Sequence, residues 1–181
     1  MIATAINRNS TWPRPAGLLG GLLRGALAGA AGTAAMDLAQ YARYRSGGGQ
    51  DRFADWEFHG VSDWEHAPAP AQVGRRAARL AGRELPDQAA NRVNNVVHWT
   101  YGIAWAAAAG AVVALTGRRR RPWWGPVHGT AVWLSDYVTL PLLGLYQPIW
   151  RYDAKTLARD WADHATYGTV AGLAYRLLAV P

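Results

Sequence analysis

Ionisable side chains stand inside segments that are otherwise apolar. Asp37 closes a glycine-rich apolar run, Asp136 is the one charged residue of 122–150, and His98 lies in 93–117, which holds no Asp, Glu, Lys or Arg. Carboxylates and imidazoles exchange protons and bind cations, and inside a membrane they face a partner or a water-filled cavity because exposure to lipid is costly. These residues are therefore the first candidates for a functional site.

A fourth apolar segment brings His164 to a similar level. If four helices alternate in direction, the ends of the first and third meet the starts of the second and fourth beside the segment 47–92. At a rise of about 1.5 Å per residue, Asp37, His98 and His164 lie roughly 6 to 12 Å below that surface, and Asp136 lies somewhat deeper. We predict one polar vestibule formed by Asp37, Gln40, Asn94, Asn95, His98, Asp136, Asp160, Asp163 and His164.

Two interpretations of this vestibule stay open. In one, acid–imidazole pairs and amide hydrogen bonds satisfy one another and fix the register of the helices. In the other, the same groups pass or sense protons or small cations. A structural or regulatory role, with another membrane protein or anionic lipid as partner, is the alternative function. A membrane-embedded enzyme ranks third and no catalytic residue is assigned, because no nucleophile with a paired base and no familiar metal motif is present.

The polar segment 46–92 holds a second group of candidate ligands. DWEFH at 55–59 and DWEH at 63–66 form a near-repeat eight residues apart. Imidazole and carboxylate suit zinc or manganese, so a divalent metal is conceivable there. An interfacial loop anchored by Trp56 and Trp64 explains the same pattern and is preferred. The candidate metal ligands are Glu57, His59, Asp63, Glu65 and His66.

Composition excludes several classes of protein. The chain has no cysteine, so disulfides, thiolate metal sites and cysteine nucleophiles are absent. The net charge of +7 comes almost wholly from arginine, and the basic turn 118–121 is typical of a topology anchor between two apolar segments, so no nucleic-acid partner is expected. His128 could pair with His98 or His164 on a haem, but neither haem nor another cofactor is expected.

Apolar helices must carry the vestibule residues. The charge-poor intervals 93–117 and 122–150 are each long enough to cross a bilayer core of roughly 30 Å as a helix of about 20 residues. We predict an all-α, single-domain membrane bundle over 1–181, with a polar loop over 46–92. The competing class is a soluble helical bundle, which the mean hydropathy of −0.12 favours. The predicted spans cover about 17–45, 93–115, 123–145 and 156–178.

Glycines are placed to let helices approach closely. They recur every four residues in the first span and again in the fourth, and small residues permit the close backbone contacts on which helix association in lipid depends. Use within the chain is favoured, and a homo-oligomer or a membrane protein partner stays an alternative. The predicted packing glycines are Gly17, Gly21, Gly25, Gly29, Gly168 and Gly172.

A basic amphipathic helix is predicted near 70–83. Pro68 and Pro70 are typical of a helix start, and Val73, Ala77 and Leu80 fall on one helical face. Such a helix lies on anionic headgroups or on the rim of the bundle. The candidate lipid-headgroup ligands are Arg75, Arg76, Arg79 and Arg83.

Several stretches are similar to those of a known family. They are the Ala/Gly-rich first span, HW in NNVVHWTYGIAW, DYVTLPLLGL in the third span and ADHATYG in the fourth. In these features the chain resembles the YagU-like family of small bacterial inner-membrane proteins, in an actinobacterial-looking branch. The resemblance implies a multi-pass protein of the plasma membrane with both termini in the cytoplasm. It also implies an association with acid tolerance and no settled biochemical activity.

Overall fold

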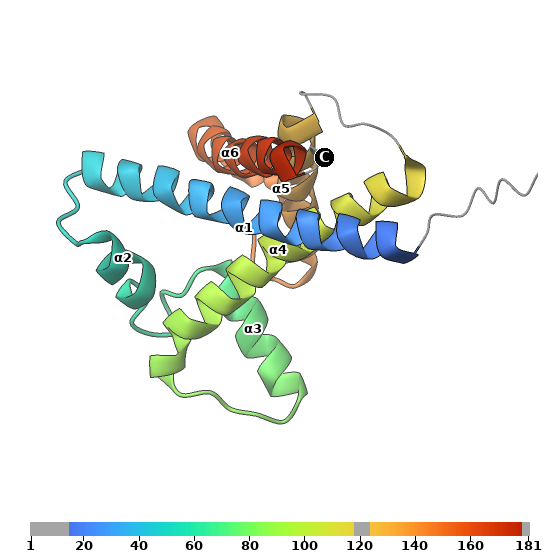
Figure 1. The fold of residues 1–181 in the computed structure, drawn as a ribbon. Coiled ribbons are helices and arrows are strands. Elements are labelled where there is room, and N and C mark those ends of the chain that lie inside the picture. The colour runs from blue at the N-terminus through green and yellow to red at the C-terminus, as the bar shows by residue number, and fades with distance from the viewer. Residues whose placement is uncertain (1–14, 118–123, 179–181) are drawn as a thin grey trace, which may run out of the picture.

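The computed structural model describes residues 15–117 and 124–178, and every regular element in these ranges is a helix (Figure 1). The all-α prediction is confirmed for these residues. The basic turn 118–121 and the first residue of the predicted span 123–145 lie outside them. The elements are α1 (Pro15–Ser46), α2 (Phe53–His59), α3 (Ala69–Leu80), α4 (Ala90–Thr116), α5 (Trp124–Leu142) and α6 (Ala154–Leu178), with short 3-10 helices η1 (Asp87–Ala89) and η2 (Ile149–Arg151).

The four long helices begin and end within three residues of the predicted spans, and the end of the third is among the larger differences. There α5 stops at Leu142, because Gly144, three residues after Pro141, has a φ of 65° that turns the chain out of the helix. Within the described residues, two helices are long and apolar enough to cross a membrane, over Gly17–Ser46 and Asp87–Thr116.

Close glycine contacts join α1 to α4. A Cβ at Gly25 would overlap the Ala106 carbonyl, and one at Gly29 would lie 2.8 Å from the Gly102 oxygen. Gly21 meets Gly110 in the same way. Three of the predicted packing glycines, Gly21, Gly25 and Gly29, thus lie at this contact. The predicted packing role is wrong for Gly17, which has open space around it because it precedes the helix crossing.

A second glycine contact joins α5 to α6. Cβ atoms at Gly168 and Gly129 would overlap backbone of the facing helix, and one at Gly172 would lie 3.0 Å from the Gly125 Cα. The other two predicted packing glycines, Gly168 and Gly172, thus lie at this second contact. Because α1 also packs against α6, the order of contacts is α4, α1, α6, α5.

The helices α2 and α3 lie on the side of α1 and α4 that is away from α6 (Figure 1). Gly74 of α3 sits against Val93 and Val97 of α4. The helix α3 ends at Leu80, and Gly82, at a φ of 71°, follows it. The predicted helix end at 83 is therefore too late, and Arg83 lies outside the helix.

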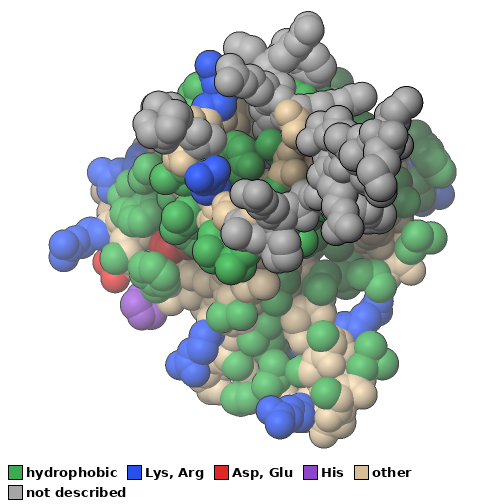
Figure 2. Space-filling view, turned by 45° about the vertical axis from the view of Figure 1, so that its right-hand side comes forward, with side chains coloured by type: hydrophobic (Ala, Val, Ile, Leu, Met, Phe, Trp, Pro, Cys, Tyr) green, Lys and Arg blue, Asp and Glu red, His purple; other side chains and the backbone are tan. Residues whose placement is uncertain are grey.

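The long helices bury several polar groups beside an apolar core, and they expose many apolar side chains. Asp37, Thr33, His128 and Asp163 are buried. Hydrophobic side chains spread over much of the described surface in Figure 2. The exposed apolar residues include Leu19, Leu23, Leu27 and Leu38 on α1, Val96, Val112 and Leu115 on α4, Val127, Leu134 and Val138 on α5, and Leu173 and Leu177 on α6.

Candidate functional site

The first acid–imidazole pair links α1 to α4. His98 Nε2 lies 2.8 Å from Asp37 Oδ1, and Asp37 is only 3% exposed. The Gly29 contact with Gly102, two helical turns before Asp37 and one turn after His98, holds the two helices close enough for this bond. The second carboxylate oxygen, Asp37 Oδ2, is buried and has no hydrogen-bond partner among the described residues.

Glu57 of α2 adds a third ionisable group beside this pair. Trp99 Nε1 donates to Glu57 Oε1 over 3.3 Å, and Asn95 Nδ2 donates to the Glu57 carbonyl over 2.8 Å. Burial, together with the negative charge of Asp37, raises the pKa of Glu57, while the Trp99 bond and His98 oppose that rise. The sequence pattern predicts Glu57 only as a metal ligand, because nothing in the spacing shows that α2 folds back on α4.

The second pair links α5 to α6. His164 Nε2 lies 3.1 Å from Asp136 Oδ2, and the Tyr101 hydroxyl of α4 donates to Asp136 Oδ1 over 2.7 Å. His164 Nδ1 lies 2.8 Å from the Asp160 carbonyl and 3.9 Å from its carboxylate. Both Asp136 oxygens are thus bound, and His164 is held at both ring nitrogens.

An ion pair and a tyrosine cluster surround the second pair. Arg43 of α1 binds the buried carboxylate of Asp163 on α6. Tyr137, Tyr146 and Tyr152 pack together with ring centroids 5.4 to 6.0 Å apart. Burial and the charges of Asp160 and Asp136 raise the pKa of Tyr146, which lies in the connector after α5.

The predicted vestibule is therefore divided into two pairs. His98 has Asp37 as its carboxylate, and His164 has Asp136. The division follows from the glycine contacts, which hold each histidine helix against the helix that carries its acid. Asn94 bonds to Asn95 over 3.1 Å, and Gln40 is half-buried on α1. A role of these residues in proton or cation handling stays a prediction.

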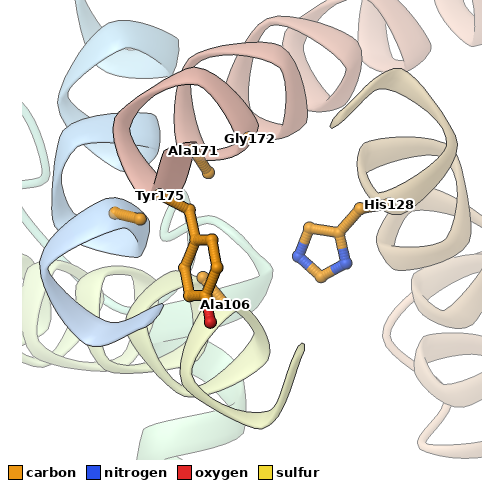
Figure 3. A pocket seen from close by; sticks show the side chains of 6 residues that line it. Ala106, His128, Ala171, Gly172 and Tyr175 are labelled. Atoms are coloured by element: carbon orange, nitrogen blue, oxygen red, sulfur yellow. The ribbon is translucent and has the colours of Figure 1, made fainter. Parts of the chain in front are cut away.

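A hollow lies between the long helices, away from the two pairs. His128 of α5 and Tyr175 of α6 extend toward it from facing helices (Figure 3). The His128 ring packs against Trp105 and Tyr167, with centroids 6.2 and 5.8 Å apart. These aromatic contacts give His128 a packing role. The hollow is lined by Ala28, Ala106, His128, Ala171, Gly172 and Tyr175.

The loop candidates for a metal do not converge. Across 15–117 and 124–178, no three His, Cys, Asp or Glu side chains are placed to hold a metal ion. His66 bonds to its neighbour Asp63 over 3.0 Å, His59 lies 3.9 Å from Asp55, and Glu65 is exposed. Hydrogen bonds from His66 and Ser62 hold the pKa of Asp63 below its usual range.

The arginines of α3 make contacts with other parts of the chain. The Arg75 guanidinium lies 5.0 Å from the Trp64 ring centroid, and Arg76 donates to the Leu143 carbonyl. Arg79 bonds to Glu84 over 3.3 Å. Lipid binding by these residues stays a prediction.

Comparisons with known proteins return no relative. No family model matches the chain, and no curated protein and no solved structure matches it.

Proposed function

We propose that the chain is a multi-pass protein of the bacterial plasma membrane that takes up and releases protons through its two Asp–His pairs. In this proposal α1, α4, α5 and α6 cross the bilayer, and α2 and α3 lie at one surface. Only 11% of the apolar window of the helix over Asp87–Thr116 is buried inside the structure. This supports insertion of α4 into the bilayer, because a core helix of a soluble protein is mostly buried.

The charges of α6 are compatible with a fourth span. Asp163 is turned inward onto Arg43, and Asp160 is half-buried beside His164. Lys155, Arg159 and Arg176 lie toward the helix ends, where long side chains reach the headgroups. The resemblance to the YagU-like family favours the same arrangement.

The observation that carries the proton function is the burial of Asp37 against His98. A carboxylate and an imidazole in apolar surroundings share a proton that either group can hold, and such groups inside membranes mark proton routes. Glu57, half-buried on α2, connects this pair to the side of the 47–92 loop. The proposed direction of exchange is therefore between that surface and the bundle interior.

Proteoliposomes with an enclosed pH dye test the proposal. On an imposed pH gradient, we expect the internal pH of vesicles with wild-type protein to change at least about tenfold faster than that of vesicles with H98A/H164A, because proton transfer by a positioned side chain contributes that much or more. The matched control is H59A/H66A, which removes two exposed loop histidines. Equal rates for wild type and H98A/H164A would contradict the proposal.

A second candidate function is binding of anionic lipid or of another membrane protein through α3. The side chain of Arg79 is 50% exposed beside its partner Glu84, and Leu80 is 86% exposed, so this end of α3 presents a partly exposed cation next to an apolar group. Binding to vesicles that contain anionic lipid, lost in R79A, together with absence of proton flux, would favour this function over the first.

A further inference from the structure

The two histidines stand in the same local sequence. H-x-T-Y-G occurs at 98–102 and again at 164–168. A polar residue precedes each histidine by four positions, Asn94 in one case and Asp160 in the other. The helix packed against each motif carries a G-x-x-x-G and then an acid, at Gly25, Gly29 and Asp37 in α1 and at Gly125, Gly129 and Asp136 in α5.

Matching positions of the two motifs make equivalent contacts in the structure. In both motifs the histidine Nε2 binds the acid of the facing helix, at 2.8 and 3.1 Å. In both, the motif glycine leaves no room for a Cβ: Gly102 lies against Thr33 and Gly168 against Gly125. The pairs α1–α4 and α5–α6 are therefore two versions of one helix-pair unit, each with its own Asp–His pair.

The motif tyrosines cross from one unit to the other. Tyr101 of the first unit donates to Asp136, whose other oxygen binds His164. Tyr167 of the second unit donates to the Gly102 carbonyl over 2.6 Å. Of the two motif tyrosines, Tyr101 is therefore the one that contacts a carboxylate. It stands one turn after His98 on the same face of α4.

We propose that Tyr101 is a positioning residue that couples the protonation of the two Asp–His pairs. A change of charge at Asp37 and His98 shifts the adjoining turn of α4. Tyr101 transmits this shift to its hydrogen bond with Asp136 Oδ1. Coupling between two sites is reciprocal, so the state of Asp136 and His164 acts on His98 to the same extent. This inference rests on the proposed function, in which both pairs exchange protons.

Other charged groups face the two pairs and are held constant in the test. Glu57 of α2 lies near Asp37 and His98. Asp160 lies beside His164, and Tyr137 and Tyr146 lie near Asp160. Arg43 of α1 and Asp163 of α6 neutralise each other. None of these groups is altered in the variants below.

Histidine ring NMR of the full chain in lipid nanodiscs tests the coupling. The titration of His164 is measured with and without D37N in three backgrounds: wild type, Y101F and the matched control Y167F. In the wild-type and Y167F backgrounds we expect D37N to move the titration midpoint of His164 by about one pH unit, which corresponds to a coupling of about tenfold. In Y101F the same substitution leaves the midpoint in place.

An equal shift in the Y101F background would overturn the proposal, as would the absence of a shift in wild type. If Y101F does not fold, the ring ¹³Cζ signal of Tyr101 in the unmodified chain replaces it. That signal should follow the titration of both histidines, and a signal that follows His164 alone or neither histidine overturns the coupling. The proton flux of wild-type vesicles is independent of this result, so flux without coupling refutes only the inference, and coupling without flux refutes only the proposed function.

Discussion

At the scale of single residues, the two acids differ in how fully they are bound. Asp136 has His164 on one oxygen and Tyr101 on the other. Asp37 has His98 on Oδ1, while Oδ2 is buried without a hydrogen-bond partner among the described residues. An unsatisfied buried oxygen is costly. Of the two pairs, the Asp37 pair is therefore the one that would gain a hydrogen bond from a water molecule at Oδ2.

Glu57 makes the docking of α2 dependent on pH. Its pKa lies above the ordinary value of 4.5, so the docked form holds the proton more tightly than the undocked form. Docking therefore weakens as the pH rises from 4.5 through the raised pKa, because ionised Glu57 is half-buried near Asp37. We expect amide hydrogen exchange in α2, corrected for its intrinsic pH dependence, to accelerate over this range in wild type but not in E57Q.

The matched control for this measurement is E65Q, because Glu65 is exposed on the same loop. E65Q should behave as wild type. If α2 of E57Q exchanged with the pH dependence of wild type, the placement of Glu57 beside the first pair would be incorrect.

At the scale of elements, glycine contacts decide which helices become neighbours and hence which acid each histidine meets. Such contacts are readable from sequence on one side only: Gly21, Gly25 and Gly29 stand out by their spacing, whereas Ala106 and Gly102 on the facing helix do not. The register between α1 and α4, which fixes the pairing of Asp37 with His98, therefore had to come from the structure.

Alanine at Gly25 and at Gly17 should have opposite effects on stability. A Cβ at Gly25 would overlap the Ala106 carbonyl and lie 2.8 Å from the Ala107 Cα, so we expect G25A to cost about 1–3 kcal/mol by overpacking. Gly17 has open space, so G17A should be neutral or stabilise by up to about 1 kcal/mol through helix propensity. Thermal unfolding in detergent measures both. A lower Tm for G17A than for G25A would contradict the packing described for α1 and α4.

At the scale of the whole molecule, the sequence predicts the helices better than the site. Long intervals without charge locate α4 to within three residues at its start. The site depends on contacts between segments far apart in the chain, such as Glu57 with Trp99 and Arg43 with Asp163. The H-x-T-Y-G repeat is visible in the sequence, but its meaning depends on seeing the two histidines bind equivalent acids.

The central claim is that all four long helices cross the membrane, because only then do both Asp–His pairs lie within it. The chain has no cysteine, so single cysteines at Ser46, Thr116 and Gln147 report the sides on which the connections lie. With cytoplasmic termini, S46C and Q147C should react with an impermeant thiol reagent in intact cells, and T116C should react only after permeabilisation. If Q147C instead behaved as T116C does, α5 would not cross the membrane and the four-span account would be contradicted.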